Sequence, residues 1–243
     1  MAFVFEHLRR MKESNRKVPV DRISSLPDEL LINIINFLPI KYAVITSILS
    51  RRWINLFKEV THLDIDDSFL CNSYNAFIAF TCKMLYSAKL SNMIRFRINN
   101  ERCLFTSVDR WLDVILCHRI QEIDLRIQMP LRLPDSMFTC KTLCILKLTE
   151  CYVILNIPDT VCLPCLKILH LKKFMFSDAD VISRILSGCP LVHELVLTPC
   201  HWDELDQLSV SAPSLTKLIL GKGCLAYPPL SLVTVVAPLL LRC

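Results

Sequence analysis

The apolar residues of the first part of the chain, residues 21–58, recur at the three- and four-residue spacing of amphipathic helices. A first set is Leu30, Leu31, Ile34, Ile35 and Leu38, and a second is Val44, Ile45, Ile48 and Leu49. Pro39 ends the first helix and can begin the second, and Ser25 is placed to cap the first. We therefore predict three short helices, the third containing Trp53, and expect more apolar surface than so small a bundle can bury by itself.

After residue 59 the apolar pattern becomes L-x-x-L-x-L, with other aliphatic residues allowed. Six copies begin at Met93, Ile120, Leu143, Leu166, Val192 and Leu215, so the successive spacings are 27, 23, 23, 26 and 23 residues. An irregular extra set, Leu205, Leu208 and Val210, lies within the last interval. This period is typical of leucine-rich repeats, in which each copy is a short strand of a parallel sheet and the leucines point into a solenoid. Return helices are predicted near residues 106–117 and 177–188.

The residues that alternate with the strand leucines are predicted to line the concave face of the sheet, because successive side chains of a strand point to opposite faces. They form two rows: Arg95, Glu122, Ile145, Ile168, Glu194 and Lys217, and then Arg97, Asp124, Lys147, His170, Val196 and Ile219. Mixed charge and partly apolar character favour a protein or peptide ligand over a polyanion. The candidate target-binding residues are Asp124, Lys147, His170, Val196 and Ile219, and the alternative is an ordinary sheet face without a ligand.

The end of the chain repeats an earlier segment. Residues 210–215 are echoed 25 residues later by residues 235–240, and the chain stops at Cys243, where a strand should continue. A solenoid needs a polar terminal cap. We therefore expect a truncated isoform, a fragment or a shortened gene product, whose last twenty residues are poorly ordered or aggregation-prone.

The composition is that of a folded chain, with 53% apolar and 21% charged residues. Its three glycines disfavour phosphate-binding loops and dinucleotide folds, which need glycine for close backbone approach. Thirteen cysteines without a secretory signal indicate free thiols in the cytoplasm and/or nucleus. The apolar run over residues 232–241 is too short to span a bilayer, so no membrane partner is predicted.

The net charge of +5 lies in residues 1–58, which hold ten Lys or Arg against five Asp or Glu, while the rest of the chain is neutral. A nucleic-acid reader usually carries its basic patch on the folded domain, so no nucleic-acid partner is predicted. The basic residues before position 20 are interpreted as a flexible tail, with a nuclear-import signal as the alternative.

The sequence contains no arrangement that marks a catalytic or metal site. Cys162-x-x-Cys165 has the spacing of half a zinc site, but a structural site needs four ligands and Cys140-x-x-x-Cys144 is a poor second pair. The six histidines form no H-E-x-x-H motif and no setting for an activated nucleophile. We therefore predict no cofactor, metal or catalytic residue, although an enzyme of unknown type remains a third class of hypothesis.

Both parts of the chain resemble one plant family. Residues 21–53 resemble the plant F-box, with D-R-I-S-x-L-P-D-E-L-L, then F-L-P, then S-x-L-S-x-R-W. The repeats resemble those of plant F-box proteins, with C-L-P-x-L-K-x-L-H-L at residues 162–171 and S-G-C-P at residues 187–190. Many such proteins carry a further C-terminal FBD module, before which this chain ends. The resemblance implies an α+β fold, in which a three-helix F-box (20–60) follows a basic tail (1–19) and precedes an α/β leucine-rich-repeat solenoid (61–243).

The resemblance also implies a function, which is to act as the non-catalytic substrate-recognition subunit of an SCF-type (Skp–cullin–F-box) E3 ubiquitin ligase. Docking to a Skp-type adaptor, and through it to a cullin, would leave the repeats to hold an unidentified target protein. The implied adaptor-binding residues are Leu26, Pro27, Leu30, Leu31, Ile34, Leu38 and Pro39, bordered by Leu49 and Trp53. Ile40 and Tyr42 depart from the Thr and acidic residue that are common in the family. The alternatives are a repeat-based binding or scaffold protein whose F-box does not engage the ligase, and a small helical subdomain with no partner.

Overall fold

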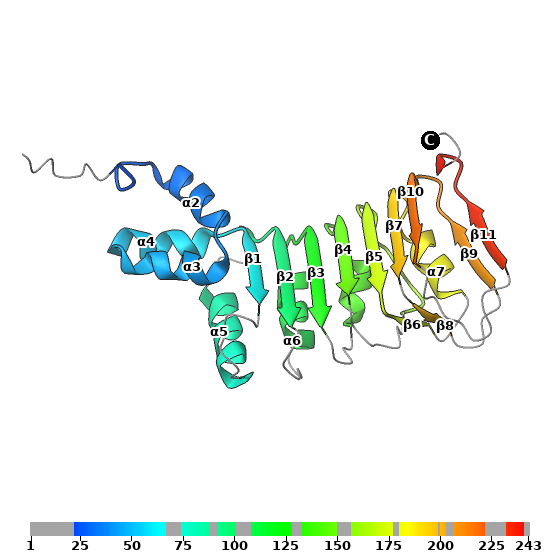
Figure 1. The fold of residues 1–243 in the computed structure, drawn as a ribbon, viewed down its shortest axis with the longest axis horizontal. Helices are drawn as coiled ribbons and strands as arrows, with labels where there is room; N and C mark the ends of the chain where they lie inside the picture. Colours follow the sequence, from blue (N-terminus) through cyan, green and yellow to red (C-terminus); the bar gives the residue numbers. More distant parts are fainter. Residues whose placement is uncertain are drawn as a thin grey trace, which may run out of the picture.

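The computed structural model describes residues 22–66, 74–87, 92–100, 108–127, 133–149, 157–176, 180–198, 200–202, 207–221 and 232–240. Within them, a helical unit leads into a long row of parallel strands, with helices along one side of the row (Figure 1). This arrangement confirms the predicted α+β fold of an F-box followed by a solenoid. The predicted basic tail at residues 1–19 lies outside the described residues.

The helical unit confirms the prediction of three short helices. They are α2 (Asp28–Asn36), α3 (Ile40–Ile45) and α4 (Arg51–Leu56), and the 3₁₀ turns η1 (Thr46–Ile48) and η2 (Phe57–Glu59) follow α3 and α4. Pro39 precedes the first residue of α3, as expected of a residue that ends one helix and begins the next.

Ser25 does not cap helix α2, so that prediction is wrong. The residue before the helix is Pro27, and no side chain caps the free N–H groups of the first turn. Ser25 Oγ instead donates to the carbonyl oxygen of Arg22 at 2.8 Å, and Leu26 N–H donates to Ile23 at 3.0 Å. The preceding segment therefore closes on itself as a turn, which uses the hydroxyl locally.

The main sheet has seven parallel strands in the order β1-β2-β3-β4-β5-β7-β10. Their bounds are β1 (His62–Asp66), β2 (Arg95–Asn100), β3 (Glu122–Ile127), β4 (Ile145–Thr149), β5 (Ile168–Lys172), β7 (Glu194–Thr198) and β10 (Lys217–Leu220). The strand partners repeat the spacing of the sequence pattern: Glu122 pairs with Ile145, and Ile145 pairs with Ile168. Each strand thus adds one repeat, and the leucines of successive repeats stack into one core.

Strand β1 was not predicted. Its apolar set, Val60, Leu63 and Ile65, has the same L-x-x-L-x-L spacing and is fully packed in the core. It lies 33 residues before the next copy, which is longer than the other intervals, and it directly follows the last turn of the helical unit. The solenoid therefore begins one strand earlier than the pattern indicated, and its first strand is continuous with the helices.

The return segments lie on the convex side of the sheet (Figure 1). Helices α6 (Val108–Leu116) and α7 (Val181–Ser187) confirm the predicted return helices in their described parts, and residues 106–107 and 177–179 lie outside them. Gly188 ends α7, as predicted. Helix α5 (Tyr74–Ser87) and the 3₁₀ helix η5 (Asp135–Thr139) were not predicted. Together these elements cover the apolar back of the strands.

The far end of the solenoid holds two short ribbons. Strand β9 (Gln207–Ser211), which arises from the irregular extra set, pairs with β11 (Leu232–Val236), and β6 (Met175–Phe176) pairs with β8 (His201–Trp202). Val210 lies opposite Val235, so the two segments that repeat 25 residues apart in the sequence include strands that pair with each other in register. Among the last twenty residues, β11 therefore has a strand partner in β9, while residues 222–231 and 241–243 lie outside the described part. The expected poor order of this end of the chain stays a prediction.

Candidate functional site

Helix α2 carries two apolar stripes, of which only one is covered. Leu31 and Ile35 are fully buried, as expected of residues four apart on one side of a helix. Leu30 and Ile34, one position earlier in each turn, are 49% and 43% exposed, and Phe37 at the end of the helix is 88% exposed. An amphipathic helix of a self-contained domain has a single apolar stripe, so the second stripe is surplus to the fold.

The segment after Pro39 extends this surplus. Tyr42, Ile45 and Ile48 recur every three residues and are exposed, as is the adjacent Leu49. Of the nineteen large hydrophobic residues that are exposed in the described part of the chain, ten lie between residues 23 and 54. We call one set of them the exposed apolar face: Leu30, Ile34, Phe37, Leu38, Tyr42, Ile45, Ile48 and Leu49.

The predicted adaptor-binding residues divide between this face and the core beneath it. Leu30, Ile34, Leu38 and Leu49 belong to the face, Pro27 and Pro39 are exposed, and Leu26 is half-buried against the core. Leu31 is fully buried and Trp53 is 5% exposed, so both belong to the core. Ile40, which stands where the family commonly has Thr, is also buried. Its apolar side chain contributes to the core, which offsets the loss of a capping hydroxyl.

Arg52 was not predicted to have a role, yet it holds the entry to helix α2. Its Nε donates to Asp28 Oδ1 at 2.6 Å, Nη1 donates to the carbonyl oxygen of Ser24 at 2.8 Å, and Nη2 donates to that of Leu26 at 2.6 Å. One guanidinium thus fixes the turn that carries Leu26 against helix α4. The signal in the sequence was the arginine of S-x-L-S-x-R-W, which precedes Trp53.

The concave face has the predicted composition. Arg97, Asp124, Lys147 and His170 lie opposite one another on β2, β3, β4 and β5, and the row continues through Val196 and Ile219. Asp64 on β1 extends the row by one strand. The register therefore brings the five candidate target-binding residues into one line across the sheet.

Two of these candidates differ in how far they are exposed. Val196 is only 5% exposed, because it is a small side chain flanked in register by His170 and Ile219. Ile219 is 41% exposed and its neighbour Leu220 is 40% exposed, although the pattern predicted a buried Leu220. Strand β10 is the last strand in the order of the main sheet, so no further strand of that sheet packs beside it.

Ion pairs organise both ends of the concave face. Arg95 donates to both carboxylate oxygens of Asp64, at 3.1 and 2.8 Å. At the other end, Glu194 Oε1 lies 2.9 Å from His170 Nε2 and accepts from Lys217 Nζ at 3.1 Å. Hydrogen bonds from Lys217 and His170 lower the pKa of Glu194.

His170 is held in its neutral form more strongly than an exposed histidine. Burial lowers its pKa below the usual value, and the hydrogen bond and charge of Glu194 offset this only in part. The positive charges of Lys147 and Lys172 lower the pKa further. His170 therefore lies among cations on the concave side.

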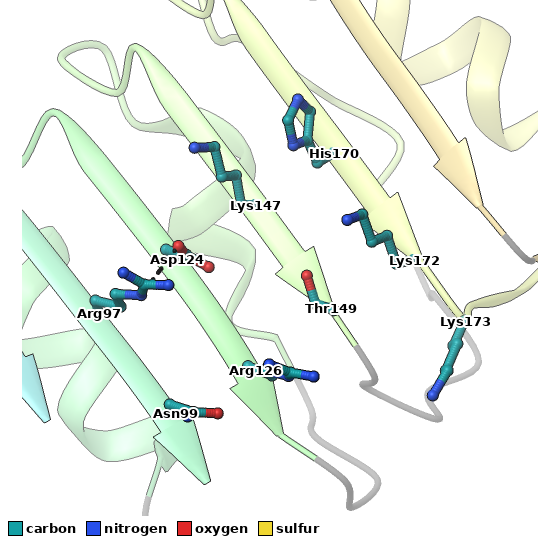
Figure 2. Close-up of a pocket in the computed structure, with 9 residues that line it drawn as sticks. All are labelled: Arg97, Asn99, Asp124, Arg126, Lys147, Thr149, His170, Lys172 and Lys173. Carbon is teal, nitrogen blue, oxygen red and sulfur yellow. Dashed lines mark ion pairs between the residues drawn. The ribbon is translucent and has the colours of Figure 1, made fainter. Parts of the chain in front are cut away.

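A third row on the concave face was missed by the sequence analysis. Asn99, Arg126, Thr149 and Lys172 lie opposite one another, two residues beyond the row of Lys147 and toward the carboxyl ends of the strands. They border a cavity of about 450 Å³ over β2–β5, which Figure 2 shows. The same alternation that gave the first two rows would have found them.

Two kinds of site are absent from the residues that the structure describes. Among them, no group of three or more His, Cys, Asp or Glu side chains is arranged to hold a metal ion. No helix in this part of the chain is both long and apolar enough to cross a membrane.

Comparison with known proteins agrees with the two parts of the fold. The family model of the F-box domain matches residues 23–63, and the model described as "FBD-associated F-box protein At5g56370, LRR repeats" matches residues 108–243. The chain belongs to the plant F-box/leucine-rich-repeat family. F-box domains generally bind a Skp-type adaptor, and F-box/leucine-rich-repeat proteins are generally non-catalytic adaptors.

Relatives of this F-box/leucine-rich-repeat chain come from Arabidopsis thaliana. It is 34% identical to "F-box/FBD/LRR-repeat protein At4g26340" and 36% identical to "FBD-associated F-box protein At5g60610", with 82% and 85% of the chain and 49% and 52% of the relatives covered. "F-box/LRR-repeat protein At1g55660" is 31% identical, with 90% of the chain and 65% of the relative covered. The chain thus spans about half the length of the first two. No solved structure matches it.

Proposed function

We propose that the chain is the substrate-recognition subunit of an SCF-type E3 ubiquitin ligase. A Skp-type adaptor covers the exposed apolar face and links the chain to a cullin, while the concave face of the solenoid binds the target protein. The chain itself makes and breaks no covalent bond. It acts in the cytoplasm and/or nucleus, where the ubiquitin machinery and reduced cysteines coexist.

The observation that supports this proposal is the second apolar stripe of helix α2. Leu30 and Ile34 are about half exposed, although the fold has a core directly beside them. Burying a side chain of this kind against a partner is favourable by about 1.5–3 kcal/mol when burial is complete. Exposed apolar residues concentrated in one small helical unit, here ten of the nineteen in the described part of the chain, are typical of a protein-binding surface.

The two faces are held in one body, which suits a bridging subunit. Strand β1 begins two residues after the last helical turn, and the solenoid extends away from the helices (Figure 1). A rigid connection keeps a bound target at a fixed distance from the adaptor, which raises its effective concentration near the ubiquitin-charged enzyme.

The test is complex formation with a purified Skp-type adaptor on a sizing column. Ile34→Asp places a charge on the exposed apolar face and should abolish the complex, because a carboxylate would be buried without a partner. Val114→Asp is the matched control, since Val114 is also 43% exposed and also helical but lies on the convex helix α6. This control should bind the adaptor as the unmutated chain does.

Two outcomes would contradict the proposal. An unmutated chain that stays separate from the adaptor would favour the alternative of a repeat-based scaffold whose F-box does not engage the ligase. Equal binding by Ile34→Asp and Val114→Asp would show that the adaptor uses another surface. Thermal unfolding of both variants checks that each is folded.

A further inference from the structure

Two half-buried isoleucines lie side by side on the concave face of the solenoid. Ile145 on β4 and Ile168 on β5 are opposite each other in the register of the sheet. The next residue of each strand, Leu146 or Leu169, is buried in the core, so the isoleucines point to the other, concave side. This pair offers apolar area that a ligand on the concave face can bury.

A glutamate flanks the isoleucine pair on each side. Glu122 on β3 is opposite Ile145, and Glu194 on β7 is opposite Ile168. One row across four strands therefore reads Glu, Ile, Ile, Glu. Neighbouring strands are about 4.8 Å apart, so the two carboxylates bound an apolar stretch about 14 Å wide.

The two glutamates differ in what balances their charge. Glu194 Oε1 lies 2.9 Å from His170 Nε2 and accepts from Lys217 Nζ at 3.1 Å. The carboxylate of Glu122 is half-buried and forms no hydrogen bond or ion pair with another residue in the described part of the chain. Its partner in the register on β2 is Arg95, whose guanidinium is bonded to Asp64 instead. Glu122 is therefore the carboxylate of this row that a ligand can pair with.

The position of Glu122 limits which ligands can cover the isoleucines. A side chain that packs on Ile145 also removes water from the carboxylate one strand away. A carboxylate that loses water without gaining a partner is strongly unfavourable, whereas an approaching cation restores the lost interaction. A ligand of this row should therefore carry a Lys or Arg beside its apolar side chain.

The next residues along the strands restrict where that cation can lie. Lys147 and Lys172 lie on β4 and β5, toward the carboxyl ends of the strands (Figure 2). The pKa of His170 is lowered chiefly by burial, and the charges of these two lysines lower it further. On β3, Asp124 is already paired with Arg97 at 3.3 Å. A cationic side chain of a ligand is thus repelled from this part of the face and favoured beside the glutamate of β3.

We propose that this row binds an extended segment of the target protein in which a Lys or Arg lies two residues from a large apolar side chain. The cation lies against Glu122, and the apolar side chain packs between Ile145 and Ile168. The inference rests on the proposed function, because it assigns a ligand class to the concave face of the recognition subunit.

The spacing of the strands fits such a segment. The midpoint between the two isoleucines is one and a half strand separations from Glu122, which is about 7 Å. Side chains two residues apart on one side of an extended peptide are about 6.8 Å apart. A peptide that crosses the strands can therefore place both side chains at once.

The experiment measures the fluorescence anisotropy of labelled peptides added to the 243-residue chain in complex with a Skp-type adaptor. Each peptide consists of Gly and Ser except at two positions, two residues apart, which are lysine and leucine, glutamate and leucine, or lysine and serine. We expect the lysine–leucine peptide to bind. The glutamate–leucine peptide should bind at least about 10-fold more weakly through repulsion, and the lysine–serine peptide about 10-fold more weakly through lost apolar contact.

Charge reversal locates the site. Glu122→Lys should invert the preference, so that the glutamate–leucine peptide binds at least about 10-fold more tightly than the lysine–leucine peptide. Asp113→Lys is the matched control, because it changes the net charge equally at an exposed position of the convex helix α6 and should keep the original preference. If Glu122→Lys fails to fold, Glu122→Gln keeps the shape of the side chain and should remove the preference for lysine. Ile145→Ser combined with Ile168→Ser should remove the preference for leucine over serine.

The remaining outcomes would overturn the inference. They are a lysine–leucine peptide that binds no more tightly than the other two, and an equal effect of Glu122→Lys and Asp113→Lys. Tighter binding of the glutamate–leucine peptide to the unmutated chain would assign the face to acidic segments instead. The Ile34→Asp chain, which should lose the adaptor, should still bind the lysine–leucine peptide, so this inference and the proposed function can fail separately.

Discussion

Asn36, the last residue of helix α2, accepts a hydrogen bond from the backbone N–H of Thr61 at 3.0 Å. Thr61 immediately precedes β1, and its carbonyl oxygen accepts from Ile94 and Arg95 N–H at 2.8 and 3.1 Å. A single amide side chain thus joins the helical unit to the first strand pair of the solenoid. This bond is one of the links that make the two faces of the molecule parts of one body.

Replacing Asn36 with leucine should loosen this junction. The half-buried Thr61 N–H would lose its acceptor, which costs about 1–3 kcal/mol in the free energy of unfolding. Urea denaturation measures the loss, and hydrogen exchange at the Thr61 amide should become faster. Asn33→Leu is the matched control, because Asn33 is exposed on the same helix. Similar destabilisation by both variants would mean that the bond does not hold the junction.

Leu30 and Leu31 are adjacent on helix α2, yet truncating Leu31 should chiefly affect stability and truncating Leu30 should chiefly affect adaptor binding. Leu31→Ala should lower the free energy of unfolding by about 2–5 kcal/mol, because Leu31 is fully buried and its removal leaves a cavity. Leu30→Ala should change stability by less than about 1 kcal/mol but weaken adaptor binding, because half of that side chain faces outward. Denaturation curves and adaptor titrations on the same two variants test this. A loss of stability in Leu30→Ala equal to that in Leu31→Ala would contradict the two-stripe description of the helix.

The sequence pattern predicted the periodic part of this fold well, because strand leucines must stack and therefore recur. It missed β1, whose copy of the pattern is separated by a longer interval, and it missed α5, whose apolar residues were not recognised as a return helix. It also wrongly assigned Ser25 as the cap of helix α2. A hydroxyl near a helix start can form a hydrogen bond either with the helix or within a local turn, and only tertiary contacts decide between the two.

The sequence predicted the exposed apolar face and the concave face to different degrees. Periodicity identified Leu30 and Leu31 as apolar, but the direction in which each points depends on where α4 packs. The concave row followed from strand alternation, whereas the cavity depends on the register of four strands and on the left-handed turn at Lys173. A turn of that kind breaks the local rule from which the row was derived.

Gly188, in S-G-C-P, is required by close packing and not by its backbone angles, since its φ is −88°. A Cβ at this position would lie 2.3 Å from the carbonyl oxygen of Val161, which belongs to backbone and cannot rotate away. Gly188→Ala should therefore destabilise the chain by about 1–3 kcal/mol. Gly221→Ala is the comparison, because a Cβ there would first meet the side-chain atoms Cγ2 and Cβ of Thr198, at 2.5 and 2.7 Å, while the nearest backbone atom, Thr198 Cα, would be farther away at 3.1 Å. Thermal or urea unfolding should rank Gly188→Ala as the more harmful, and the reverse order would contradict this reason for the glycine.

Stability should fall as the solution is acidified, in two steps. The pKa of His170 in the folded chain lies below its usual value of 6.5, chiefly through burial, and the pKa of His62 is lowered for the same first reason. As the pH falls through 6.5, the unfolded chain takes up protons that the folded chain refuses, so stability decreases until the lowered pKa values are passed. Glu194, whose pKa lies below 4.5, adds stability above that value and loses it as the pH falls through its folded pKa.

The measurement for this prediction is the urea midpoint at pH 7.5, 5.5 and 4. His170→Gln combined with His62→Gln should flatten the change between the first two values, because no imidazole then titrates at these positions, and should leave the further loss below pH 4.5 in place. Glu194→Gln should reduce that lower step. A midpoint that rises on acidification from pH 7.5 to 5.5 in the unmutated chain, or an unchanged slope in the double histidine variant, would show that Glu194 compensates for burial more fully than the geometry indicates.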